Sequence, residues 1–98
     1  MLGERTKCLE LFRISWHDPI THTSWCSDRE ALNKQPGLCS TVGWFVNRDD
    51  KCLRLAMHYN NDGEWSDIFL VPLGCLAEEP EKVSEITVCL TTVPAEAA

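Results

Sequence analysis

The stretch that decides the fold is residues 40–59, which reads STVGWFVNRDDKCLRLAMHY. In its second half, apolar residues alternate with other residues from Leu53 to Tyr59, and in its first half Val42, Trp44 and Val46 share one face. Alternation with a period of two is typical of half-buried strands. Residues 48–51 are polar and turn-like, so the stretch predicts a hairpin made of strands 40–47 and 52–59.

Three more strands are predicted outside this hairpin, at residues 8–17, 66–71 and 83–90. Between the first of them and the hairpin, Ser27 and Glu30 have the spacing of a capping box. This spacing predicts a short helix over residues 28–35, which Pro36 and Gly37 end. The predicted order is one strand, a short helix and then four strands.

The fold class that follows is mostly β, a β-rich α+β domain with one short helix. Five short strands with tight turns predict a small barrel of the SH3 or Sm type, or a strongly bent sheet. The alternative is an open α+β sheet with the helix on one face. A length of 98 residues suits one domain, which we assign to residues 1–92, with a flexible tail at residues 93–98.

The charge balance restricts the partners that we expect. The chain carries a net charge of −6, and its nine Lys and Arg residues are scattered along it. Proteins that follow a nucleic-acid backbone carry a basic patch, so we expect no long nucleic acid as a partner. A small anionic ligand stays compatible, because a few local cations and backbone N–H groups can hold it.

Neither a membrane segment nor a secretion signal is predicted. No apolar run approaches the ~18 residues of a membrane span, and the charged N-terminus lacks an apolar signal region. The six cysteines are widely spaced, with no C-x-x-C pair, and Cys52 and Cys89 fall within predicted strands. We therefore expect a cytoplasmic protein that has no membrane partner and whose cysteines are reduced, buried thiols.

The first group of candidate ligand-binding residues comprises Trp16, Asp18 and Trp25. Aromatic side chains stack on nucleobases, at roughly 1–3 kcal/mol per base. A carboxylate such as that of Asp18 accepts hydrogen bonds from an amine or a ribose hydroxyl. The structural alternative is that both tryptophans pack the helix against the barrel, while Asp18 caps a turn before Pro19.

The second group lies in and around the hairpin. Gly43 marks either a strand kink or a close backbone approach, which would set Trp44 against a ligand or a partner subunit. Arg48 and Arg54 cluster near the hairpin, either solvated or as a cationic spot that grips a phosphate. We include His58 with these residues as a ligand-binding side chain.

Metal binding and catalysis are not predicted. The spacing of His17, His22 and Cys26 matches no established zinc pattern. Cys26, His22 and Asp28 can be drawn as a nucleophile triad, but the chain has no nucleophile, phosphate-loop or metalloprotease motif. We therefore expect no metal, no cofactor and no enzyme.

One sequence pattern resembles short proteins encoded by bacteriophages and prophages. It comprises Trp16-His17-Asp18, Trp25, Glu30, the segment 40–46 that reads STVGWFV, and the segment 68–74 that reads IFLVPLG. The resemblance extends from Phe12 to Leu90. Proteins of this size and class include phage anti-defence proteins, some of which are homo-oligomeric "sponges" for nucleotide immune signals. The resemblance therefore implies an action in the cytoplasm of an infected bacterial host.

Three functional hypotheses follow from these observations. The first is a non-catalytic protein that sequesters a small nucleotide, a cyclic nucleotide or an ADP-ribose derivative, as a homo-oligomer. The second is an inhibitor or adaptor that binds a host protein through its aromatic surface or through the acidic residues 78–85. The third is a small enzyme that destroys such a signal.

Overall fold

The computed structural model describes residues 5–91. It contains strands β1 (Arg5–Asp18), β2 (Gly37–Arg48), β3 (Cys52–Tyr59), β4 (Trp65–Pro72) and β5 (Glu81–Leu90), with helix α1 (Asp28–Leu32) and a 3-10 turn, η1 (Leu73–Cys75). The fold class is therefore mostly β with one short helix, as predicted. The tail predicted at residues 93–98 lies outside the described residues.

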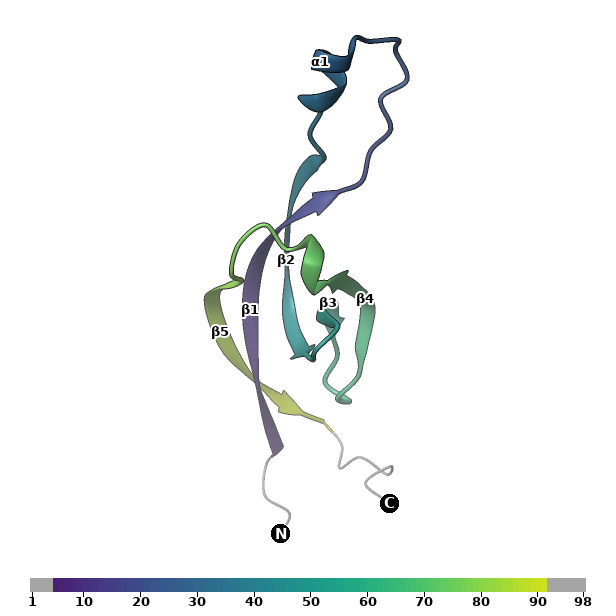
Figure 1. Cartoon of the computed structure of the whole chain (residues 1–98). Helices are drawn as coiled ribbons and strands as arrows, with labels where there is room; N and C mark the ends of the chain where they lie inside the picture. Colours follow the sequence, from purple (N-terminus) through teal and green to yellow (C-terminus); the bar gives the residue numbers. More distant parts are fainter. Residues whose placement is uncertain (1–4, 92–98) are drawn as a thin grey trace.

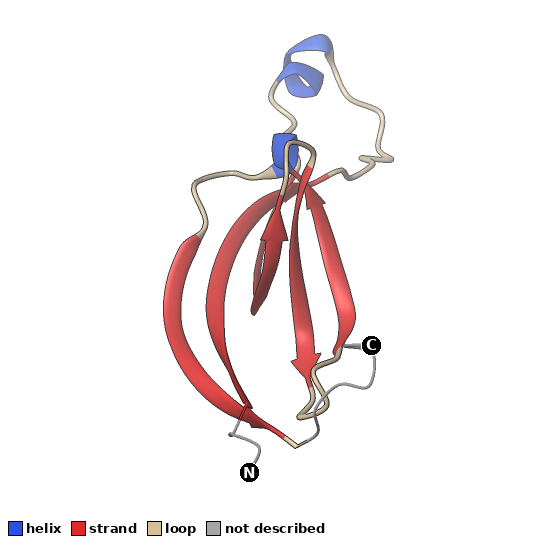
Figure 2. Ribbon diagram, turned by 90° about the horizontal axis from the view of Figure 1, so that it is seen from below, coloured by secondary structure: helices blue, strands red, loops and turns tan. Residues whose placement is uncertain are grey.

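All five strands form one antiparallel sheet in the order β4-β3-β2-β1-β5. The strands curve around a common interior (Figure 2). The sheet does not close into a barrel, because β4 and β5 are its two edges, so the strongly bent sheet is the correct form of the prediction. The end of β5 nevertheless meets the β3–β4 turn, where the Thr91 N–H donates to the Asn61 carbonyl oxygen at 2.8 Å.

The concave face of the sheet, which we call the inner face, carries most of the hydrophobic core. Its fully buried centre consists of Ile14, Leu53, Leu55 and Val71. Aromatic pairs surround this centre: Phe12 packs on Phe45 with ring centroids 5.0 Å apart, and Trp16 packs on Phe69 at 5.2 Å. The first pair lies on the neighbouring strands β1 and β2, whereas the second joins β1 to the edge strand β4, so the bend lets one sheet enclose its own core.

Gly43 belongs to this inner face and is buried. A Cβ at this position would lie 2.7 Å from Met57 Cε and 3.0 Å from Leu55 Cβ. Of the two interpretations of this glycine, the structure shows a close approach, and the approaching group is the neighbouring strand β3. The glycine therefore serves the packing of β2 on β3.

Residues 19–36 leave the sheet as a projection between β1 and β2, which we call the arm (Figure 1). Every residue of the arm is exposed, including all of α1, which lies at its tip. The molecule is accordingly elongated, with extents of 72 × 24 × 22 Å and a radius of gyration of 19.0 Å. A compact chain of this length has a radius of gyration of about 13 Å.

Helix α1 begins as predicted but ends earlier. Both hydrogen bonds of the capping box are present: the Glu30 N–H donates to Ser27 Oγ and the Ser27 N–H donates to Glu30 Oε1. The helix was expected to reach residue 35, yet it ends at Leu32, and Asn33 Nδ2 donates to the Arg29 carbonyl oxygen. Since no surface packs against α1, nothing supports a further turn. The alternative of a helix lying on one face of the sheet is therefore wrong for this chain.

The expectation of buried thiols is also wrong. All six cysteines are unpaired, but Cys8, Cys26 and Cys89 are exposed and the other three are partly exposed. Cys26 lies on the arm, and Cys8 and Cys89 lie on the β1–β5 pair near its end, where little packs over them. Their places in strands did not imply burial, because successive side chains of a strand point to opposite faces: Cys8 lies beside Glu85, while its neighbour Leu9 is buried.

Candidate functional site

The structure places the seven predicted ligand-binding residues in several parts of the molecule. Trp16 faces the core, where its Nε1 donates to Thr41 Oγ1 at 2.9 Å. Trp25 is fully exposed on the arm. The structural alternative was that both tryptophans pack the helix against the barrel. Trp16 does have a packing role, but it packs on Phe69 of the sheet and not on the helix.

Asp18 and Arg48 lie at strand ends. Asp18 is the last residue of β1 and stands opposite Gly37. Within residues 5–91 its carboxylate accepts no hydrogen bond that would cap the turn before Pro19. Arg48 ends β2, and its Nη1 pairs with Glu79 Oε1 at 3.1 Å. Neither residue lies beside Trp44 in the strand register.

Three of the seven residues come together: Trp44, Arg54 and His58. Trp44 on β2 stands directly opposite Ala56 on β3, and residues directly opposite each other share a face of the sheet. Arg54 and His58 lie two residues to either side of Ala56, on the same face and each about 7 Å from it along the strand. We call this the outer face, because it is the reverse of the face that carries the core.

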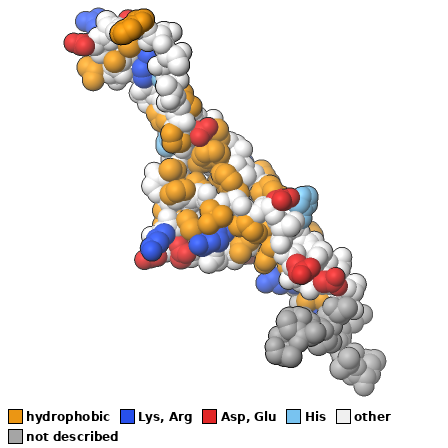
Figure 3. All heavy atoms as spheres, turned by 90° about the vertical axis from the view of Figure 1, so that its right-hand side faces the viewer, with side chains coloured by type: hydrophobic (Ala, Val, Ile, Leu, Met, Phe, Trp, Pro, Cys, Tyr) orange, Lys and Arg blue, Asp and Glu red, His pale blue; other side chains and the backbone are white. Residues whose placement is uncertain are grey.

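The outer face is also apolar across the sheet. The register aligns Leu11, Trp44, Ala56 and Ile68 in a row over four strands, and Ile86 on β5 stands opposite Leu9. Val42, Ile68, Leu70 and Ile86 are exposed on this face, whereas Ala56 and Leu9 are buried within it. No helix or second sheet from residues 5–91 covers it. Figure 3 shows hydrophobic side chains gathered on the body of the molecule, with charged groups between and around them.

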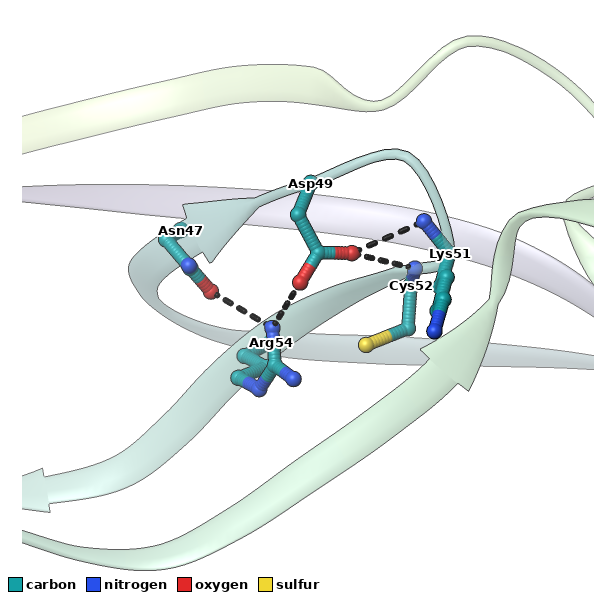
Figure 4. Close-up of polar contacts among 5 residues, drawn as sticks. All are labelled: Asn47, Asp49, Lys51, Cys52 and Arg54. Atoms are coloured by element: carbon teal, nitrogen blue, oxygen red, sulfur yellow. Dashed lines mark hydrogen bonds and ion pairs between the residues drawn. The ribbon is translucent and has the colours of Figure 1, made fainter.

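Arg54 is fixed in position by the hairpin loop (Figure 4). Its Nη1 donates to Asp49 Oδ2 at 2.9 Å and to Asn47 Oδ1 at 3.1 Å. Asp49 Oδ1 in turn accepts hydrogen bonds from the backbone N–H groups of Lys51 and Cys52. Because both oxygens bond to Nη1, Arg54 Nε and Nη2 face no oxygen acceptor among the residues that the structure describes.

This arrangement shifts the pKa values of both partners. The hydrogen bond from the Cys52 backbone N–H, together with those from Arg54 and Lys51, lowers the pKa of the Asp49 carboxyl far below its usual range. The hydrogen bond to Asp49 raises the pKa of the Arg54 guanidinium. Asp49 is thus a carboxylate and Arg54 a cation at neutral pH.

His58 has a carboxylate partner of its own. Its Nε2 lies 3.2 Å from Asp67 Oδ2, and both side chains are about two-thirds exposed, at 68% and 69%. Asp67 has a φ of 56°, the only positive φ at a residue other than glycine within residues 5–91. A left-handed residue within an edge strand turns its side chain out of the regular alternation, and here the carboxylate reaches the imidazole of the neighbouring strand.

The apolar members of this site were not among the residues predicted from the sequence. Leu11, Ala56 and Ile68 occupy the strand positions between the inward-pointing residues. The missing information was the register: only the alignment of strands β1 to β4 shows that these residues form a row with Trp44.

Other classes of site are not seen in this part of the chain. Within residues 5–91, no three His, Cys, Asp or Glu side chains gather as metal ligands do. His22, Cys26 and Asp28, which can be drawn as a triad, are all exposed on the arm. None of the helices within the same range is long and apolar enough to cross a membrane.

Comparison with known proteins adds no relative. The chain matches no protein-family model, no curated protein and no solved structure. The outer face and the arm are the surfaces from which a function can be inferred.

Proposed function

We propose that this protein is a non-catalytic binding protein of the phage anti-defence type, which sequesters a small nucleotide signal in the cytoplasm of an infected bacterium. The observation that carries the proposal is the grouping of Trp44, Arg54 and His58 on the outer face. A half-buried indole flanked by two cationic or protonatable side chains suits a ligand with both an aromatic base and a phosphate.

Each side chain has a distinct role in this proposal. Trp44 stacks on the base. Arg54 offers Nε and Nη2 to phosphate oxygens while Asp49 and Asn47 hold its Nη1, so little side-chain freedom is lost on binding. His58 contributes a hydrogen bond from the imidazole that Asp67 holds in place. The ligand leaves unchanged, because the proposal includes no nucleophile.

The test is a thermal-shift panel of cyclic nucleotides and ADP-ribose derivatives with the full-length protein. A ligand at about 100 times its dissociation constant raises the melting temperature of a domain of this size by roughly 10–20 °C. We expect a shift with at least one nucleotide, recovery of that nucleotide intact, and loss of the shift in Trp44→Ala and Arg54→Gln. The matched control is Lys34→Gln, which removes a cation from the arm.

Each result of the panel has a different meaning. A nucleotide recovered in altered form would make the protein an enzyme. An unchanged shift in Arg54→Gln would remove the outer face as the site, and the absence of any shift would reject nucleotide binding.

A second candidate function rests on a different observation, the full exposure of Trp25 on an arm that has no buried residue. Exposed tryptophans on projections are typical anchors of protein interfaces. In this alternative the protein is an inhibitor or adaptor that inserts the arm into a host protein. Capture from a bacterial lysate by the wild-type chain, lost in Trp25→Ala and kept in Trp44→Ala, would favour it over nucleotide binding.

A further inference from the structure

The outer face and the arm are two incomplete surfaces of one chain. Small domains are built from at least two packed layers, because a sheet face rich in apolar side chains must be covered. In this chain the inner face is covered by the bend of the sheet, whereas the outer face has no covering layer from residues 5–91. Its exposed apolar side chains, those of Val42, Ile68, Leu70 and Ile86, offer a contact surface.

The arm has exposed apolar side chains but no surface of its own to pack them on. It carries Ile20, Trp25 and Leu32, with Leu38 at its base, all exposed, and it has no surface on which to bury them. Its helix has only five residues, too few for stability without packing. Yet both hydrogen bonds of the capping box are formed, so the sequence specifies a helix at a place where its own chain offers nothing to pack it.

The arm does not cover the outer face of its own chain. It continues the direction of β1 and β2 away from the body, with α1 at the far tip (Figure 1). Contact between the two surfaces therefore requires two molecules. The two surfaces have complementary forms. The outer face is a broad apolar surface that lacks a cover, and the arm is a narrow apolar projection that lacks a surface to pack on.

The charges at these surfaces permit contact between two identical chains. The arm carries two acidic residues, Asp28 and Glu30, and two basic residues, Arg29 and Lys34, so its net charge is 2 − 2 = 0 although the chain carries −6. On the outer face, Arg54 and His58 each have a carboxylate partner within the chain, and so does Arg13, which bonds Glu81. Two copies can thus meet there without bringing like charges together.

The size of the surfaces also fits. A standard interface uses about 20 to 30 residues on each side. Residues 19–36 of the arm, together with the outer-face residues of the strands, supply a set of this size from each copy. In a reciprocal exchange each arm lies on the other copy's outer face. The arm–face contact is then formed twice, and the dimer closes with two-fold symmetry.

We propose that two copies of this chain form a closed dimer in which the arm of each copy packs on the outer face of the other. The exchange brings Trp25 of one copy to the face that holds Trp44, Arg54 and His58 of its partner. A base stacked on Trp44 would then have a second aromatic side chain available to cover it. This last step rests on the proposed nucleotide binding, whereas the dimer does not.

The dimer is tested first, without nucleotide, by sedimentation equilibrium on the full chain over a dilution series. We expect a mass of about 22 kDa, twice the 11.1 kDa of one chain. Trp25→Ala on the arm and Ile68→Glu or Leu70→Glu on the outer face should each give the monomer mass. Val83→Ala is the matched control, because Val83 is exposed on β5 at the irregularity in its pairing and should leave the dimer intact.

A mixing experiment separates exchange from other dimers. Trp25→Ala chains keep an intact face and Leu70→Glu chains keep an intact arm, so their mixture can form one complete arm–face contact and should recover dimers that neither variant forms alone. Arm-to-arm or face-to-face dimers would give no recovery. Circular dichroism of each variant establishes that it is folded, and Trp25→Ala alters no residue that packs in the core.

The outcomes distinguish the dimer from the proposed function. A wild-type chain that stays monomeric, or a Trp25→Ala chain that stays dimeric, overturns the exchange whatever the nucleotide panel shows. A dimer that binds no nucleotide overturns the proposed function and leaves the exchange standing. If both hold, nucleotide affinity should fall in Trp25→Ala and return in the mixture with Leu70→Glu.

Discussion

The Cε atom of Met57 occupies the space where a side chain at position 43 would begin, 2.7 Å from the Cβ that Gly43 lacks. Met57 could turn aside, but Leu55 Cβ at 3.0 Å and the Ala56 carbonyl oxygen at 3.1 Å belong to β3 and cannot move without the strand. The glycine thus sets the spacing between β2 and β3 at the centre of the core.

Gly43→Ala should therefore destabilise the protein by about 1–3 kcal/mol, the usual cost of overpacking a core. Urea unfolding of the wild type and the variant measures this difference. In a Met57→Ala background most of the cost should remain, because the clash with β3 itself persists. Full relief in that background would show that Met57 alone is responsible.

Trp16→Phe should remove the hydrogen bond from Nε1 to Thr41 Oγ1 while keeping an aromatic ring beside Phe69. We expect a loss of about 1–2 kcal/mol in the free energy of unfolding, part of it from the unpartnered threonine hydroxyl. Thr41→Val, alone and combined with Trp16→Phe, completes a double-mutant cycle. Additive losses would mean that the two side chains are not coupled.

Asp49 should contribute stability that depends on pH. Its pKa in the folded chain lies below the ordinary value of 3.8, so the unfolded chain takes up a proton at a higher pH than the folded chain does. The contribution is complete above that ordinary value and declines as the pH falls below it toward the lowered folded value. Urea unfolding of Asp49→Asn and wild type at pH 7 and in acid should show a difference that narrows in acid. A constant difference would contradict this account.

Ser27→Ala should act on the arm alone. Loss of the capping box costs a helix about 0.5–2 kcal/mol, yet α1 buries no residue, so the free energy of global unfolding of the monomer should change by less than about 0.5 kcal/mol. Amide hydrogen exchange should accelerate within residues 28–34 and stay unchanged in β3. Global destabilisation at concentrations where the chain is monomeric would show that the arm packs on the body of its own chain.

Much of the sheet could be predicted because alternation and turn residues report directly on backbone form. Strand β3 was predicted with its observed bounds, residues 52–59, since apolar and other residues alternate throughout it and polar turns flank it. β2 begins at Gly37, before its predicted start at residue 40, because its pairing with β1 continues to the base of the arm. β1 begins at Arg5, before its predicted start at residue 8, because its pairing with β5 continues there.

The candidate site could be predicted only in part. Trp44, Arg54 and His58 were singled out for their chemistry, and whether they are neighbours depends on which residue of β2 faces which residue of β3. That register includes an irregularity between Phe45 and Asn47, which no local pattern of residue types reveals. Trp25 illustrates the converse: its residue type suggests burial, and only the three-dimensional path of residues 19–36 shows that nothing lies near enough to bury it.

The pairing of the first strand with the last has a mechanical consequence. Arg5 and Leu90 stand opposite each other at the end of the β1–β5 pair, so a load applied between the two ends of the described chain acts on adjacent strands at the same point. The inter-strand hydrogen bonds of antiparallel strands lie across the strands, so such a load opens them one after another and never loads them all at once. The protein should therefore yield to stretching at low force, by peeling β5 from β1, while the β2–β3–β4 part of the sheet is still folded.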